Sequence, residues 1–299
     1  MKAFRLFTLL IAAWPAFAHA ALNVFACEPE WGALVAELGG DAVKVYTATT
    51  AFQDPHRIEA RPSLIAQMRR ADLAVCTGAE LEIGWLPVLL RQSGNAAIQP
   101  GQPGYFEAAR QVALREKPAT LDRAQGDVHA AGNQHIQTDP RKIARVAQAL
   151  GARLAEIDAD HATTYRARLA DFNTRWNAAM ARWQTQSAPL RGMSIVVQHQ
   201  AFPYLEDWLG LKQVAVLEPK PGVEPSVGHL AEVAARLKTV PARAVVRAAY
   251  QDPRPAAWLA EHAGIPLTVL PFTVGGSDRS KDLFGLFDDT LEQLLKAAR

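Results

Sequence analysis

The amino-acid sequence predicts an α/β protein of two α/β lobes with mostly parallel sheets, joined by a long backbone helix. Short β-branched runs alternate with longer segments of helical period in both halves of the chain, which is typical of parallel sheets covered by helices. The longest segment of helical period separates the two halves. With 299 residues, the chain is also longer than a single hydrophobic core usually organises.

The first residues have the pattern of a secretory signal peptide. Two positive charges precede an apolar run at residues 6–17, and small residues suited to cleavage follow at residues 18–20. The run is shorter than the ~20 apolar residues that span a membrane. We therefore expect residues 1–20 to be removed and the mature protein, beginning near Ala21, to be exported and soluble.

The N-terminal lobe is expected to comprise residues 21–138. Apolar runs predict buried strands at residues 22–27, 43–48 and 72–77. Helices are predicted at residues 29–39 and from Pro62, because proline suits the first helical turn. Prolines and glycines interrupt the pattern at residues 96–133, where we expect a loop-rich surface region.

The connecting backbone helix is predicted at residues 139–186. Asp139 can cap its start, and Pro140 takes the first helical position. Apolar residues recur along it at steps of three and four, the spacing of one helical face. A helix of this length would extend about 60 Å. It therefore either spans both lobes or breaks, near Gly151 or at residues 158–160.

The C-terminal lobe, residues 187–299, repeats the alternation of the first. Strands are predicted at residues 194–198, 213–217, 243–247 and 266–270. Helices are predicted at residues 226–238, 254–263 and 282–297.

The charge balance argues against a nucleic-acid surface. The 32 Lys and Arg residues nearly match the 30 Asp and Glu residues, and the two signs are interspersed. The HExxH and GxSxG spacings of two common hydrolase classes are also missing from the sequence.

The two cysteines, Cys27 and Cys76, each end an apolar run that is predicted to be a buried strand. Export would place them where a disulfide persists, and neighbouring strands lie about 5 Å apart, close to disulfide reach. We expect a bridge that acts as a structural staple; the alternative is two buried thiols. Without CxxC spacing, thiol chemistry has little support.

Three histidines lie in connections between predicted elements. His56 follows the second strand, His135 directly precedes the long helix, and His199 ends the strand at residues 194–198. A loop histidine by itself is more often solvated than a ligand, but open α/β folds place ligands at the carboxyl ends of strands, which favours His199. Three other histidines fall in predicted helices and are interpreted as surface or packing residues: His161, His229 and His262.

A turn with carboxylates, residues 274–284, follows the last predicted strand. It offers Asp278 and Asp282 as ligands, although Asp282 is also a natural N-cap for the terminal helix. Three imidazoles and one carboxylate suit a borderline ion such as Zn²⁺ and complete a tetrahedral shell. Such a shell leaves no open water position of the kind that catalytic zinc uses, which favours binding over hydrolysis.

Short motifs follow one another in a characteristic order along the mature chain. They include Asp54-Pro-His56, Gly132-Asn-Gln-His135, Asp139-Pro140 and His199-Gln-Ala-Phe202. Their order resembles the metal-binding receptors of zinc and manganese ABC importers, the ZnuA/TroA/AztC-like family. The resemblance implies an ion between two lobes, with His56 and His135 as first-lobe ligands and His199 and one aspartate as second-lobe ligands.

The resemblance also implies a function. The protein would be a periplasmic, high-affinity receptor that delivers Zn²⁺ to the membrane permease of an ABC importer. It would not be an enzyme, and it would act as a monomer. A periplasmic metallochaperone is a further candidate partner. The alternatives are a receptor for manganese, another divalent metal or an organic solute, and a secreted zinc hydrolase with Glu80 or Glu82 as general base.

Two features depart from the family pattern. In many relatives the acidic ligand directly follows the last strand, and here that position is Val274. The histidine-rich loop of many zinc receptors is also missing, and the equivalent stretch, residues 116–131, contributes only His129. His129 is interpreted either as an exposed loop residue or as a transient relay for metal delivered by a partner.

Overall fold

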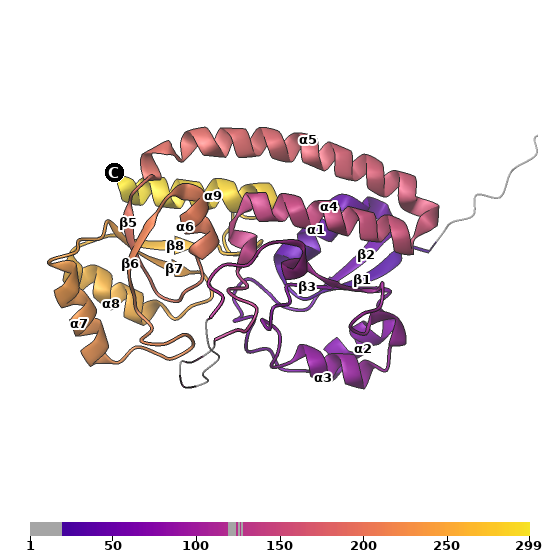
Figure 1. Cartoon of the computed structure of the whole chain (residues 1–299), viewed down its shortest axis with the longest axis horizontal. Helices are drawn as coiled ribbons and strands as arrows, with labels where there is room; N and C mark the ends of the chain where they lie inside the picture. Colours follow the sequence, from indigo (N-terminus) through magenta and orange to yellow (C-terminus); the bar gives the residue numbers. More distant parts are fainter. Residues whose placement is uncertain (1–19, 119–123, 125, 127) are drawn as a thin grey trace, which may run out of the picture.

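The computed structural model describes residues 20–118, 124, 126 and 128–299. The predicted signal peptide, apart from Ala20, lies outside these residues. Two α/β lobes lie side by side, and one long helix runs across both (Figure 1). The predicted fold class is confirmed. No helix in the described part of the chain has both the length and the apolar character needed to cross a membrane.

The first lobe is built on four parallel strands in the order β2-β1-β3-β4. They are β1 (Leu22–Ala26), β2 (Val43–Thr47), β3 (Leu73–Cys76) and β4 (Tyr105–Glu107). Its helices are α1 (Pro29–Gly39), α2 (Pro62–Arg70) and α3 (Leu86–Ser93). Alternate side chains of β1 serve opposite faces, because Val24 and Ala26 pack toward α1 whereas Phe25 packs toward α2 and α3.

Strand β4 corrects one prediction from the sequence. It lies within residues 96–133, the stretch expected to be loop-rich surface, and it pairs with β3 as the edge strand of the sheet. With three residues it is too short for alternation to show in the sequence.

The second lobe has four parallel strands in the order β6-β5-β7-β8. They are β5 (Ser194–Val197), β6 (Lys212–Val216), β7 (Ala244–Ala248) and β8 (Leu267–Leu270). Its helices are α6 (Pro203–Leu209), α7 (Val227–Leu237), α8 (Pro253–Ala263) and α9 (Leu283–Ala298).

The predicted connecting helix is a helical hairpin. α4 (Pro140–Ile157) and α5 (Ala162–Gln186) pack against each other and are separated by a 3-10 turn, Ala159–His161. The Asp158 carboxylate holds this turn, since it accepts a hydrogen bond from the Tyr165 hydroxyl at 2.5 Å and lies 2.9 Å from Nδ1 of His161. Of the two alternatives that the sequence leaves open, the break is therefore the one observed, and α5 alone runs across both lobes (Figure 1).

In the described part of the chain, buried apolar side chains form one central and two outer clusters. The central cluster is continuous from the first sheet through α1, α4, α5 and α9 to the second sheet. Trp176 and Trp183 of α5 are fully buried in it. The outer clusters lie under α2 and α3 in the first lobe and under α7 and α8 in the second. Apolar packing along α5 therefore fixes how the lobes face each other.

The predicted disulfide between Cys27 and Cys76 is confirmed. Cys27 directly follows β1 and Cys76 ends β3, the neighbouring strand, and their Cα atoms lie 4.8 Å apart. Both side chains are fully buried in the outer cluster of the first lobe. The bridge therefore joins β1 to β3 at the carboxyl end of the first sheet.

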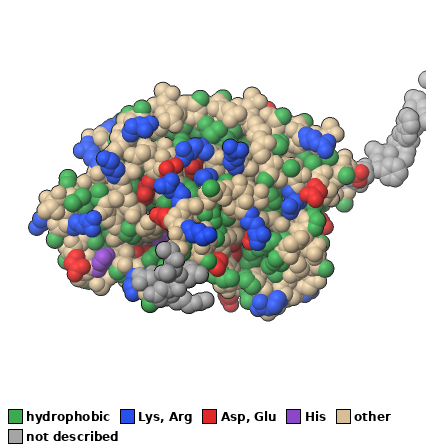
Figure 2. Space-filling view, viewed as in Figure 1, with side chains coloured by type: hydrophobic (Ala, Val, Ile, Leu, Met, Phe, Trp, Pro, Cys, Tyr) green, Lys and Arg blue, Asp and Glu red, His purple; other side chains and the backbone are tan. Residues whose placement is uncertain are grey.

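The visible surface has no large region of one charge. On the face shown in Figure 2, Lys and Arg side chains are interspersed with Asp and Glu side chains and with uncharged surface. This distribution agrees with the near balance of charges in the sequence.

Candidate metal centre

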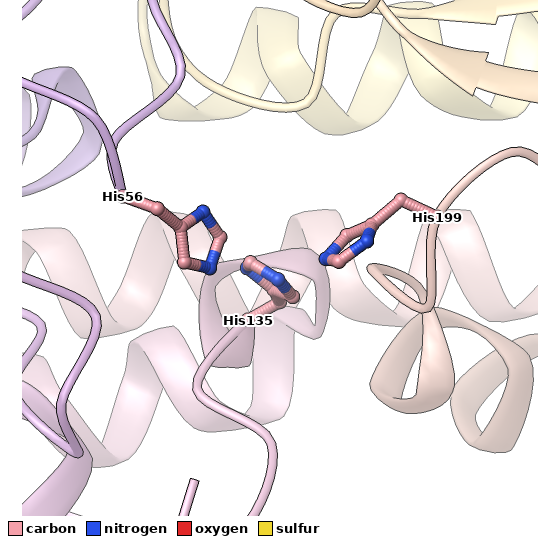
Figure 3. Close-up of side chains that lie close together, drawn as sticks. All are labelled: His56, His135 and His199. Carbon is pink, nitrogen blue, oxygen red and sulfur yellow. The ribbon is translucent and has the colours of Figure 1, made fainter. Parts of the chain in front are cut away.

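Three histidines from distant parts of the chain meet between the lobes. His56 lies in the loop between β2 and α2, His135 precedes the 3-10 turn that leads into α4, and His199 lies just after β5. Their ring centroids are 5.5, 5.6 and 5.8 Å apart. A ligand nitrogen from each ring lies within 4.8 Å of the other two. In Figure 3 the three rings point toward one another from separate segments.

His56 is oriented by a carboxylate. Its Nδ1 lies 2.8 Å from Oδ1 of Asp54, whose carboxylate also accepts from the His56 backbone N–H at 3.0 Å. Burial alone would raise the pKa of Asp54, but its hydrogen bonds with His56 outweigh burial and the pKa is lowered overall, so the carboxylate stays ionised. The loop is anchored where Trp85 Nε1 donates to the Pro55 carbonyl at 2.9 Å. With Nδ1 held by Asp54, Nε2 is the nitrogen that faces the other rings.

His199 is oriented in the same way by the second lobe. Its Nδ1 lies 2.7 Å from Oε2 of Glu218, which follows β6, the neighbouring strand in the sheet. The same carboxylate oxygen accepts from the Gly222 backbone N–H at 2.8 Å. A carboxylate behind an imidazole fixes the tautomer and makes the other nitrogen a better ligand.

His135 is the most enclosed of the three rings. It is 1% exposed, and neither ring nitrogen has a hydrogen-bond partner among the described residues. Burial, followed by the charges of the neighbouring histidines, lowers the pKa of His135 well below its usual value, so the ring is neutral. A buried imidazole with both nitrogens unsatisfied is costly unless another group binds it.

The segment around His135 is tied to the second lobe. The Asn133 side chain accepts from the His135 backbone N–H at 3.0 Å and donates to the Gln200 carbonyl at 2.8 Å. The Tyr204 hydroxyl donates to the Asn133 carbonyl at 2.6 Å. These bonds hold His135 beside His199 before any ion is bound.

The arrangement fits a transition-metal ion. Neutral imidazole nitrogens suit zinc, copper, nickel and iron better than they suit magnesium or calcium. The unsatisfied nitrogens of His135 are the observation that a bound ion would explain most directly. The two carboxylates behind His56 and His199 are the partners that metal-binding histidines usually have.

Asp278 and Asp282, the carboxylates predicted as ligands, are both exposed and do not belong to the three-histidine cluster. Asp282 is the N-cap of α9, where its carboxylate accepts from the Gly285 backbone N–H at 2.7 Å. Val274 packs against the central core. Their assignment as the fourth ligand stays a prediction.

His129, the predicted relay, lies beside the cluster. Its ring stacks on that of His56 at 5.9 Å between centroids, and its side chain is 13% exposed. Its Nδ1 lies 3.7 Å from Oε2 of Glu80. His129 lines one cavity together with His135 and His199. A residue that lines the approach to the cluster is well placed for a relay, which stays a prediction.

The glutamates considered as general bases serve the first lobe in other ways. Glu82 is buried, accepts from the Thr77 backbone N–H at 2.7 Å, and has a pKa raised by burial to about 7. Glu80 accepts from the Ala130 backbone N–H at 3.0 Å. Among the described residues, the Glu82 carboxylate lies close to the two sulfurs of the disulfide and is not part of the three-histidine cluster.

Three residues of the site were missed in the sequence: Asp54 and Glu218 behind the rings, and Gln134, whose Nε2 lies 2.9 Å from Nε2 of His56. Asp54 could have been found, because it lies two residues before His56. Glu218 could have been found as a carboxylate at the carboxyl end of β6, next to β5. Gln134 gave no signal, because the sequence does not show its side chain turning toward His56.

The other histidines of the mature chain have local partners. His262 stacks on Trp258 at 3.8 Å between ring centroids, and His229 lies 3.8 Å from Glu232 within α7. His161 belongs to the turn between α4 and α5.

A family model matches almost the whole mature chain. Residues 24–297 match the family described as "Zinc-uptake complex component A periplasmic", ZnuA. Among curated relatives, the zinc-binding lipoprotein AdcA of Streptococcus pneumoniae is 24% identical over 213 residues. That match covers 68% of this chain and 40% of AdcA, so the chain spans about two fifths of the length of that relative. The high-affinity zinc uptake system protein ZnuA of Bacillus subtilis is 23% identical, covering 82% of this chain and 76% of the relative.

Solved structures share the fold at low sequence identity. A crystal structure of ZnuA matches with a TM-score of 0.71 and 21% identity, covering 91% of this chain and 99% of that chain. The manganese-bound periplasmic metal-binding protein of Candidatus Liberibacter asiaticus matches with a TM-score of 0.73 and 14% identity, covering 93% of this chain and 100% of that chain. A cadmium-bound structure of the same protein matches with an equal score.

Proposed function

Because the chain belongs to the ZnuA family of periplasmic zinc-uptake components, we propose that it captures Zn²⁺ in the periplasm and delivers it to the permease of an ABC importer. The single observation that carries this proposal is the cluster of His56, His135 and His199 between the lobes. Within it, His135 is buried with both nitrogens unsatisfied, which is the state expected of a ligand without its ion.

Zinc is favoured over manganese by the donor atoms. Three imidazole nitrogens are softer donors than the carboxylates and water that suit manganese. The curated relatives are named for zinc, whereas one structural neighbour was solved with manganese and with cadmium. The proposal is therefore zinc as cargo, with selectivity set by the nitrogen-rich cluster.

Membership of the ZnuA family also supports the proposed location and partners. The pattern of residues 1–20 suits export, and the family is described as periplasmic. Delivery to a permease requires no catalysis, so the protein is proposed to be a receptor and not an enzyme. His129 would pass metal from the entrance of the cavity to the cluster.

The decisive experiment measures metal content and position together. The mature protein, exchanged into chelated buffer and then titrated with Zn²⁺, is expected to bind one equivalent and to retain it through gel filtration. A crystal of the loaded protein, measured on both sides of the zinc absorption edge, is expected to show one anomalous peak among the three rings. A peak elsewhere, or metal-dependent hydrolysis of ester or peptide substrates with turnover, would contradict the proposal.

A further inference from the structure

The side-chain amide of Gln134 occupies a corner of the three-histidine cluster. Gln134 is buried, and its Nε2 lies 2.9 Å from Nε2 of His56. It directly precedes His135 in the chain, so one short segment brings an amide and an imidazole to the same place. The cluster itself contains three nitrogen ligands and no carboxylate among the described residues.

The hydrogen bonding of His56 decides which atom of the amide faces it. The Asp54 carboxylate can only accept, so Nδ1 of His56 carries the proton that points at it. Nε2 of His56 is then the lone-pair nitrogen, and the neighbouring amide donates an N–H to it. This lone pair is the one that His56 would offer to a metal ion.

A metal ion bound to this lone pair would favour the amide oxygen, and not the amide N–H, beside it. The N–H of Gln134 would lose its acceptor and would face a cation, which is unfavourable for a buried donor. Rotation by about 180° about the last side-chain torsion exchanges nitrogen and oxygen with little change in shape. The amide oxygen would then lie beside Nε2 of His56 and point at the ion.

The spacing suits two ligands of one ion. With metal–ligand bonds of about 2.0–2.2 Å, two ligand atoms of a tetrahedral zinc ion lie ~3.4 Å apart. The present separation of 2.9 Å differs from this by a few tenths of an ångström, which a small movement of either side chain supplies. No backbone rearrangement is required.

We propose that Gln134 is the fourth metal ligand: its amide N–H caps His56 in the metal-free protein, and its amide oxygen turns to the ion in the loaded protein. This inference rests on the proposed function, because it assigns a ligand at the same site. It replaces the carboxylate of the predicted ligand set with a neutral oxygen. The four ligand groups are then all neutral.

Two substitutions at Gln134 separate a ligand from a mere cap. Gln134→Leu keeps the size but removes both the donor and the oxygen, and Gln134→Glu keeps an oxygen in the same place. If Gln134 is a ligand, Gln134→Leu binds Zn²⁺ about 10- to 100-fold more weakly than the unsubstituted protein in chelator competition. Gln134→Glu binds at least as tightly as the unsubstituted protein. If the amide only caps His56, Gln134→Leu binds more tightly, since nothing has to be displaced, and the proposal is overturned.

Cobalt provides a readout of the coordination shell itself. The visible absorption of bound Co²⁺ is expected to change in Gln134→Leu, as water takes the fourth position, and to stay tetrahedral in Gln134→Glu. An unchanged spectrum in Gln134→Leu contradicts the assignment. The matched control is Gln137→Leu, which alters another buried glutamine three residues along the chain; it is expected to leave both affinity and spectrum unchanged.

The aspartate variants and one further measurement distinguish the remaining outcomes. Asp278→Asn and Asp282→Asn are expected to bind Zn²⁺ like the unsubstituted protein; a large loss in either would return the fourth position to that aspartate. If Gln134→Leu does not fold, a crystal structure of the zinc-loaded unsubstituted protein decides, since the amide oxygen of Gln134 is expected within about 2.2 Å of the ion and a water or an aspartate in that position overturns the assignment. Failure of the unsubstituted protein to bind Zn²⁺ would instead overturn the proposed function.

Discussion

The two lobes share one architecture but contribute unequally to the candidate site. In each sheet the strand order is second, first, third and fourth along that part of the chain. The first lobe and the start of the hairpin contribute His56 and His135, whereas the second lobe contributes only His199. The chain's only two cysteines also lie in the first lobe, where they join β1 to β3.

The two lobes differ in the connections that follow their strands, whereas their sheets have the same strand order. The His56 loop is anchored within its own lobe through Trp85. The loop behind His199 is held from the other lobe, because Arg57 Nη2, in the same loop as His56, donates to the Gly222 carbonyl at 3.0 Å. We infer that the first lobe presents most of the site and that the second lobe completes it.

The largest expected effect is at His135, the most deeply buried of the three proposed ligands. His135→Ala removes the most buried imidazole, so we expect the Zn²⁺ dissociation constant to rise more than ~100-fold, beyond the effect of losing a supporting residue. His229→Ala is the matched control, because His229 lies on α7 away from the cluster, and it should change affinity less than about twofold. Chelator competition measures both variants. Equal effects of the two substitutions would rule out the ligand assignment.

The disulfide is the next test of the difference between lobes. Replacing both Cys27 and Cys76 by serine opens a link between residues 49 positions apart, and we expect the free energy of unfolding to fall by about 3–4 kcal/mol. Denaturant unfolding of the metal-free protein measures this loss. Zinc affinity should change little, because the bridge touches none of the three rings. A large loss of affinity with retained fold would show that the staple positions the ligands.

Acidification tests the site through proton competition. Metal binds only the neutral imidazole, and an ordinary imidazole takes up a proton below about pH 6.5. The pKa of His135 is lowered well below that by burial and by the neighbouring histidines, so His135 itself resists protonation. We expect Zn²⁺ affinity to fall roughly tenfold or more per pH unit below pH 6.5. An affinity that is constant between about pH 5 and 7.5 would count against a site of three imidazoles.

The sequence predicts the fold better than it predicts the details of the site. Strands rich in β-branched residues were found within a residue or two, whereas β4, α3 and α6 were missed because they span three, eight and seven residues. The sequence does not decide whether the helix breaks at Asp158, because the spacing of apolar residues continues through this position. The hydrogen bonds that hold the break form only after the hairpin has folded.

For the site, residue type and position relative to a strand identified the three histidines. The structure shows that their rings lie together. Their partners depend on tertiary contacts. Glu218 meets His199 across neighbouring strands, and Gln134 meets His56 across 78 residues of sequence. A carboxylate after the last strand was expected from relatives, but local geometry gives Asp282 a helix to cap.

The smallest expected effect compares the carboxylates behind the two outer rings. Asp54→Asn and Glu218→Gln each exchange a charged acceptor for a neutral one, and we expect each to weaken Zn²⁺ binding by about tenfold. Glu218→Gln should have the larger effect. Its carboxylate orients His199 and also accepts from Gly222, whose carbonyl receives the bond from Arg57 of the first lobe. Among the described residues, Asp54 hydrogen-bonds only to the ring and backbone of His56, and its Oδ2 lies 3.9 Å from Nε of Arg57.

Glu232→Gln, next to His229 on α7, is the matched control for these two substitutions and should not alter affinity. Chelator competition at pH 7.5 ranks the three variants, and crystal structures of Asp54→Asn and Glu218→Gln show whether a ring has turned. If Asp54→Asn is the more damaging, orientation of His56 within the first lobe matters more than the contact between lobes. The second lobe would then supply a ligand without holding the site closed, which would reverse the roles inferred from the loops.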